Sequence, residues 1–180
     1  MQLSALDLRK GILILYEGRM CTVIYWNILR NDRRQFVQMK VKDLHTGRVQ
    51  EMKEHGETKY EVLDTEKIDL SYSYRDANDE VFYTADGEEY RVGHEAAKDA
   101  LLWSDSTYKG LLADGKLVAI ELPLSVVGTV VDTAPPMKGG GSGTKDAVLE
   151  NGVKVRVSLL TSIGDKVRLD SETLEFKERV

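Results

Sequence analysis

The chain has 180 residues, of which 42% are hydrophobic and 31% are charged, and its formal net charge is −5 at pH 7. No apolar run approaches the ~18 residues of a membrane-spanning helix. Residues 1–4 lack the basic start and apolar core of a signal peptide, so we expect a soluble, cytoplasmic protein that makes no membrane contact. The single cysteine, Cys21, excludes an intrachain disulfide and a cysteine-based zinc site, and its apolar neighbours predict that it is buried.

Alternating apolar residues and turn dipeptides predict short strands along most of the chain. In chain order the strand patterns lie at residues 12–15, 22–26, 36–42, 81–83, 90–92, 118–122, 129–131, 153–159 and 167–169. Hairpin turns are expected at Glu17-Gly18, Asp86-Gly87, Asp114-Gly115 and Asn151-Gly152. The only helical pattern begins at His94 and continues to about Trp103. Many short strands with one brief helix predict an all-β protein of small barrels.

Changes of composition divide this pattern into three predicted domains, residues 1–63, 64–127 and 128–180. The first contains 11 Lys+Arg and 8 Asp+Glu (net +3), the second 6 and 14 (net −8), and the third 8 and 8 (net 0). The glycine-rich residues 139–143 lie between two predicted strands, so we interpret them as a loop within the third domain. A basic first domain followed by an acidic second one suits a protein that touches RNA at one end.

The segment between the predicted strands 22–26 and 36–42 is strongly basic. Asn31-Asp32 is typical of a turn, which places arginines at or near a hairpin tip. Guanidinium groups bind phosphate with two parallel hydrogen bonds and stack on bases, so this hairpin is a candidate RNA-binding element. A merely solvated hairpin explains the same residues equally well. Together with the second strand, the segment gives residues 30–42 five cations, which are Arg30, Arg33, Arg34, Lys40 and Lys42.

Patterns of catalytic and metal sites fail on their context. Lys145 follows Thr144 rather than glycine and precedes a predicted strand, so the glycine segment lacks the geometry of a nucleotide-binding P-loop. His45, His55 and His94 have no metal-ligand spacing, and we expect them at the surface. The sequence therefore predicts neither an enzyme nor a metal site.

Four segments together resemble the elongation factor P family over the whole chain. They are DLRKG at residues 7–11, MKVKDLHTG at 39–47, ELP at 121–123 and VDTAP at 131–135. The family's C-terminal signature, K-x-A-x4-G-x2-[LIV]-x-V-P-x2-[LIV]-x2-G, is followed in spacing by Lys145, Ala147, Gly152, Val155, Val157 and Gly164. Ser158 replaces the signature proline and Thr161 its aliphatic residue, changes that we interpret as tolerated variation.

The resemblance implies an SH3-like or KOW-like barrel followed by two OB-type barrels in an L-shaped arrangement that imitates tRNA. It also implies a monomeric, non-enzymatic translation factor that binds the ribosome between the peptidyl and exit sites. There it would position peptidyl-tRNA and stimulate peptide bond formation at stalled sequences such as consecutive prolines. Two alternatives stay open: an elongation-factor-P-like paralogue that acts with an unmodified arginine tip, and an OB-type RNA-binding adaptor without a ribosomal task.

In the family, the tip of the first domain is a lysine or arginine that is often enlarged by a modifying enzyme. Counting back from Thr46-Gly47 without a gap assigns the tip to Asp32, and one inserted loop residue assigns it to Arg33. We expect Arg33, because an anionic tip would be repelled by tRNA phosphates, and keep Arg34 as the alternative. No cofactor is expected; rhamnose on Arg33 and an unmodified Arg33 both stay open, and the extra charge of Asp32 beside the target favours the second.

Two further regions of the third domain match functional positions of the family. Phe176 and Arg179 correspond to a tyrosine and an arginine that family members place against the tRNA, and phenylalanine can still stack on a base. A loop that approaches the exit-site codon in the family corresponds here to Gly139, Gly140, Gly141, Ser142 and Gly143. Because this loop lacks the family's Gly-Asp-Thr-x-Gly sequence and is shorter, its contact with the codon stays open.

Overall fold

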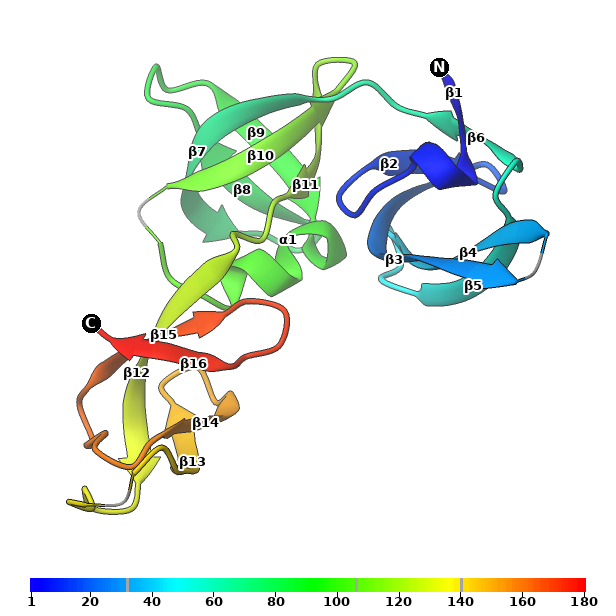
Figure 1. Ribbon diagram of the computed structural model, residues 1–180. Helices are drawn as coiled ribbons and strands as arrows, with labels where there is room; N and C mark the ends of the chain where they lie inside the picture. The colour runs from blue at the N-terminus through cyan, green and yellow to red at the C-terminus, as the bar shows by residue number, and fades with distance from the viewer. Residues whose placement is uncertain (32, 106, 140) are drawn as a thin grey trace. The chain divides into compact units, whose positions relative to one another are not determined.

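The protein is described by a computed structural model of residues 1–31, 33–105, 107–139 and 141–180. For Asn31 the main chain is described and the side chain is not. Its strands form three antiparallel sheets of six, five and five strands, each built from one stretch of the sequence (Figure 1). The expected all-β class with three small β domains is confirmed. Asp32 and Gly140, which the sequence reasoning considered, lie outside the described residues.

The first sheet has the strand order β1-β6-β2-β3-β4-β5. A short 3-10 helix, η1 (Ala5–Asp7), follows its first strand. The strands are β1 (Gln2–Ser4), β2 (Leu13–Tyr16), β3 (Arg19–Asn31), β4 (Arg34–Asp43), β5 (Val49–His55) and β6 (Lys59–Val62).

Alternation along β4 builds the core of this sheet. Val37, Met39 and Val41 are each at most 1% exposed, and the residues between them are only half-buried. Successive side chains of a strand point to opposite faces, so this pattern assigns one face of β4 to the core. Cys21 on β3 joins the same core as a buried residue, as expected, and burial raises the pKa of its thiol.

The second sheet has the strand order β11-β10-β7-β8-β9. Asp114 and Gly115 form the turn between β10 and β11, with φ of +50° and +74°. This is the left-handed conformation that a two-residue hairpin turn requires. The elements are β7 (Glu66–Arg75), β8 (Asp79–Tyr83), β9 (Glu89–Gly93), α1 (His94–Leu101), β10 (Tyr108–Ala113) and β11 (Lys116–Ile120).

Two details of this region differ from the sequence pattern. The helix ends at Leu101, and Trp103 is instead buried in the hydrophobic core of the third sheet. On β11 the pattern suggested that Val118 and Ile120 share the buried face, but Val118 is only half-buried, whereas Leu117 and Ala119 are buried like Ile120. Both faces are packed because Val118 and Ala119 lie in a cluster with Leu13 of the first sheet.

The third sheet has the strand order β14-β13-β12-β15-β16. The glycine-rich loop lies between β12 and β13, which pair with each other in this sheet. It is therefore a loop within one domain, as expected. The strands are β12 (Ser125–Thr133), β13 (Thr144–Leu149), β14 (Lys154–Ser158), β15 (Lys166–Asp170) and β16 (Phe176–Arg179).

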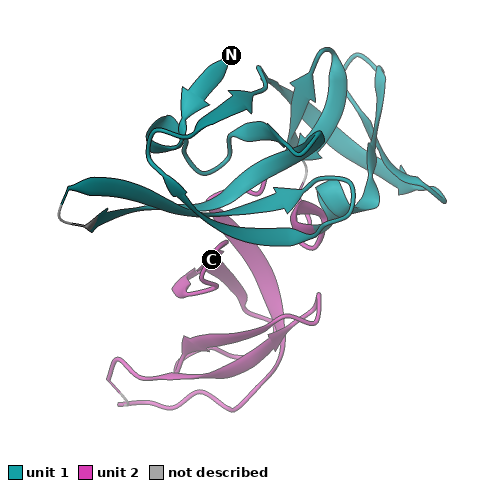
Figure 2. Cartoon of the chain, turned by 90° about the vertical axis from the view of Figure 1, so that its right-hand side faces the viewer, with its two compact units in different colours: residues 1–98, 106–121 teal, residues 99–105, 122–180 magenta. Residues whose placement is uncertain are grey.

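The chain divides into two compact units (Figure 2). Residues 1–98 and 106–121 form one unit with the first and second sheets, and residues 99–105 and 122–180 form the other with the third sheet. The domain boundaries at residues 63 and 127 stay a prediction. Within the described residues, no helix is long and apolar enough to span a membrane, and no group of three or more His, Cys, Asp or Glu side chains could hold a metal ion.

Candidate RNA-binding hairpin

The basic segment forms the end of the long hairpin of β3 and β4. Asn31 pairs with Arg34, which closes the hairpin, and Arg33 lies in the turn between them. The neighbouring strand β5 pairs with β4 as far as Phe36↔His55, and the Gly56 N–H donates to the carbonyl of Gln35 at 2.8 Å. The turn and the residue pairs next to it therefore extend beyond the part of the sheet in which β5 pairs with β4.

The register of the hairpin divides its cations between two faces. Arg34, Lys40 and Lys42 alternate with the buried Val37, Met39 and Val41, so they lie on the outer face of the sheet. Arg30 pairs with Gln35 and shares the other face with Ile28 and Val37. The sequence reasoning grouped all five cations, but the sheet brings together only three of them and places Arg30 on the opposite side.

The guanidinium groups at the tip are accessible to a ligand. Arg30, Arg33 and Arg34 are all exposed. Among the residues that the structure describes, no carboxylate forms an ion pair with these three arginines. Lys40 lies further along the outer face, with its Nζ 5.7 Å from the ring centroid of Tyr25, which pairs with it across the hairpin.

The base of the hairpin is fixed by Asp43 at the end of β4. Its Oδ1 accepts hydrogen bonds from the N–H groups of His45 (2.8 Å) and Thr46 (3.1 Å), and Arg19 lies 3.4 Å from its Oδ2. The hydrogen bond from Thr46 is the main cause that holds the pKa of this buried carboxyl below its usual range. The turn that aligns β5 with β4 is therefore held by an ionised side chain.

In the third sheet, Phe176 and the glycine loop lie around one pocket. The pocket has a volume of about 1000 Å³ and is lined by Phe176 together with Gly141, Ser142 and Gly143. Phe176 is half-buried and packs against the core, which limits the part of its ring that a ligand could reach. Arg179 does not line this pocket. Its Nη1 donates a hydrogen bond to the Leu160 carbonyl at 3.4 Å.

The signature residues of this sheet form a polar contact between two loops. Lys145 is almost fully buried, and its Nζ donates to the carbonyls of Ala134 and of Thr161, the latter at 2.6 Å. Ser158 and Thr161, the two departures from the signature, hydrogen-bond to each other through their hydroxyls at 2.9 Å. The buried hydroxyl of Thr161 thus finds its partner in the half-buried hydroxyl of Ser158.

Comparisons with known proteins agree with this arrangement. The family description "Elongation factor P (EF-P) KOW-like domain" matches residues 4–60, and "Elongation factor P, C-terminal" matches residues 126–179. The chain is 35% identical over 182 residues to elongation factor P of Dechloromonas aromatica, with 98% of each chain covered. It is 30% identical to that of Thermoanaerobacter sp. over 99% of this chain and 100% of the relative.

The chain belongs to the elongation factor P family. It is accordingly a translation factor and not an enzyme. Two solved structures resemble it in part: a translation initiation factor eif-5a family protein from Naegleria fowleri and a eukaryotic translation initiation factor 5A from Methanococcus jannaschii. They are 15% and 10% identical, cover 68% and 67% of this chain and 98% and 94% of their own, and give TM-scores of 0.41 and 0.46.

A polar network in the second sheet of this family member was not predicted from the sequence. The buried carboxylate of Glu80 accepts a hydrogen bond from the Tyr72 hydroxyl at 2.7 Å and lies 3.0 Å from Nδ1 of His94. These contacts, with burial as the larger cause, raise the pKa of Tyr72 to about 12. His94 is therefore a half-buried partner of Glu80 rather than a free surface residue, unlike the exposed His45 and His55.

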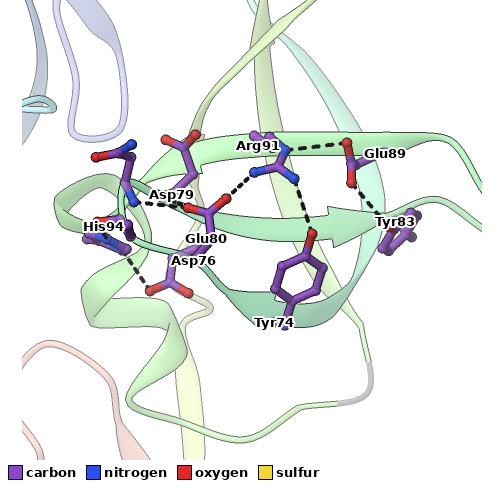
Figure 3. A network of polar contacts seen from close by, with 10 residues as sticks. Tyr74, Asp76, Asp79, Glu80, Tyr83, Glu89, Arg91 and His94 are labelled. Atoms are coloured by element: carbon purple, nitrogen blue, oxygen red, sulfur yellow. Dashed lines mark hydrogen bonds and ion pairs between the residues drawn. The ribbon is translucent and has the colours of Figure 1, made fainter.

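The same network includes a second centre at Arg91 (Figure 3). Its guanidinium group contacts Asp76, Glu89 at 3.4 Å and the Tyr74 hydroxyl at 3.1 Å. Asp76 also accepts hydrogen bonds from the N–H groups of Asn78 and Asp79, which hold its pKa below the usual range. These contacts join the β7–β8 hairpin to β9.

Proposed function

We propose that this elongation factor P family member binds the ribosome between the peptidyl and exit sites and positions peptidyl-tRNA there. It forms no bond itself. It holds the tRNA so that the ribosome's own active centre joins poor reactants, such as consecutive prolines. The observation that supports this proposal best is the exposed arginine turn at the end of β3 and β4.

The chemistry of the tip suits the acceptor end of a tRNA. A guanidinium group is always charged and binds phosphate through two parallel N–H donors. Arg33 in the turn is assigned as the probe, and Arg34 and Lys40 on the outer face as contacts to the RNA backbone. Arg30 contacts the backbone from the opposite face. Lys42 extends the cationic outer face toward the base of the hairpin.

Positioning alone can account for a large rate effect. Proline is a constrained secondary amine, so a productive geometry of the two reactants is seldom reached without help. Restricting the tRNA end to that geometry lowers an entropic barrier, and each ~1.4 kcal/mol removed accelerates the reaction about tenfold. A non-enzymatic factor with a cationic tip therefore needs no catalytic side chain.

The decisive experiment compares Arg33→Ala with the wild type in a reconstituted translation assay on a message that encodes consecutive prolines. We expect the variant to lose at least tenfold in the rate of diproline synthesis, since the probe no longer reaches the tRNA. Arg48→Ala, which removes an exposed arginine outside the hairpin tip, is the matched control and should retain full activity. Equal stimulation by Arg33→Ala and wild type would remove Arg33 from this role.

A further inference from the structure

The outer face of the first sheet contains an aromatic pair close to the arginine tip. Phe36 of β4 and His55 of β5 face each other in register, with ring centroids 4.7 Å apart and planes inclined by 36°. Phe36 lies on the face opposite to the buried Val37, is only half-buried, and its partner His55 is exposed. A ring pair in this position contributes little to the core.

Cations surround this ring pair on the same face. The Nζ of Lys53 lies 5.1 Å from the centroid of Phe36. Arg34 precedes Phe36 by two residues of the strand, which places the two side chains ~7 Å apart on one face. Glu51 is the carboxylate on this face next to Lys40, and it accepts a hydrogen bond from Gln38 at 2.8 Å. The charge is therefore positive toward the tip and mixed toward the base of the hairpin.

Magnitudes favour a nucleobase over the lysine as the partner of the Phe36 ring. A cation above an exposed ring strengthens an interaction about 2- to 5-fold. Stacking of a base on an aromatic side chain strengthens it about 5- to 150-fold. An incoming base can therefore displace Lys53 from the ring, and the freed ammonium group can bind the phosphate that follows the base.

We propose that Phe36 and His55 form a platform on which an unpaired RNA base stacks, with Lys53 and Arg34 holding the adjoining phosphates. The platform fits single-stranded RNA, because a base within a duplex has no free face. An acidic peptide would use the same cations but has no need of the ring pair. The inference deepens the proposed function, on which it rests, by assigning a base contact to a hairpin that otherwise offers only phosphate contacts.

The test measures the affinity of the full chain for two probes of equal charge by fluorescence anisotropy. One probe is a short single-stranded RNA, and the other is the same strand with abasic sugars. Wild type should prefer the RNA with bases. Phe36→Leu, which keeps an apolar side chain but removes the ring, should weaken binding of that RNA about 5- to 100-fold and leave the abasic strand unaffected.

Two further variants separate stacking from loss of structure. Phe36→Trp should restore the affinity, and its indole fluorescence should be quenched when the RNA with bases is added. Val49→Ala changes an exposed apolar residue on the same face, paired with Lys42, and should bind both probes as the wild type does. A thermal melt of each variant verifies the fold.

Equal binding of both probes by the wild type, or equal affinity of wild type and Phe36→Leu, would overturn the platform. So would a poly-glutamate peptide that binds more tightly than the RNA and depends on Phe36. The proposed function is contradicted by a different result. If the wild type prefers the RNA with bases but does not stimulate diproline synthesis, the proposed function is wrong and the platform is retained. Stimulated synthesis without that preference removes the platform alone.

Discussion

Arg33 lies in the turn of the hairpin, next to the first residue pair of the two strands, Asn31↔Arg34. This position separates it from Arg34, whose side chain is already committed to the outer face by the alternation of β4. A residue in the turn is the one that extends furthest from the sheet. The geometry therefore supports Arg33 rather than Arg34 as the probe.

The proposed unmodified state of Arg33 can be tested by mass. Unmodified arginine is long enough to reach a phosphate by itself, and the charge of the neighbouring Asp32 is expected to disfavour transfer of a sugar to Arg33. We expect the Arg33 peptide from protein purified from its native host to show no deoxyhexose increment. An increment on Arg33 would contradict this expectation, and one on Arg34 would reassign the tip.

At the scale of the element, the β4–β5 turn depends on the ionised side chain of Asp43. Its pKa is lower in the folded than in the unfolded protein, so its contribution is fully present above the unfolded value of ~3.9 and is lost as the pH falls through the folded value. We expect Asp43→Asn to lose about 1–2 kcal/mol at neutral pH, since the amide keeps an acceptor but not the charge.

Denaturant unfolding of wild type and Asp43→Asn between pH 7 and pH 2 measures this effect. The difference in the free energy of unfolding should shrink as the pH falls, because protonation removes the same charge from the wild type. Asp114→Asn is the control for loss of one aspartate: the residue is exposed, and asparagine tolerates its φ of +50°. A difference that stays constant with pH would mean that the charge of Asp43 is not the cause.

Patterns among neighbouring residues predicted the strands and turns. They did not predict which side chains from distant parts of the sequence contact each other. Neighbouring residues predict the turns at Asp114-Gly115 and Asn151-Gly152 and the buried face of β4. The basic hairpin likewise followed from two strand patterns on either side of a turn dipeptide. The platform of Phe36 and His55 depends on the register of a third strand, 19 positions away, which no pattern specifies. Glu80 and His94 likewise meet only after β8 and α1 are placed together.

Over the whole chain, the division of charge is expected to be the main determinant of where the protein binds RNA. The first 63 residues have a net charge of +3 and residues 64–127 one of −8. The acidic part is expected to repel nucleic acid and so to restrict binding to the basic hairpin. The protein is expected to act as a monomer, since one tip per molecule suffices for one peptidyl-tRNA.

Neutralising acids of the second sheet should therefore relax the selectivity of the protein for its ribosomal site. Glu88→Gln combined with Asp114→Asn removes two exposed charges from turns of that sheet. We expect the affinity for non-specific RNA to rise on the order of twofold at low salt and the difference to vanish at high salt, where the charges are screened. Filter binding at both salt concentrations measures it, and a rise that persists at high salt would exclude a long-range electrostatic cause.

The contact of Lys145 with two carbonyl groups has a consequence for the evolution of the third sheet. The lysine recognises the main chain of Ala134 and Thr161, and every amino acid supplies the same carbonyl. The side chains at these positions can thus change without loss of the contact, as at Thr161, which replaces the aliphatic residue of the family signature. Substitutions are accordingly expected to be tolerated along the loops whose carbonyl groups are bound, and not at Lys145, which binds them.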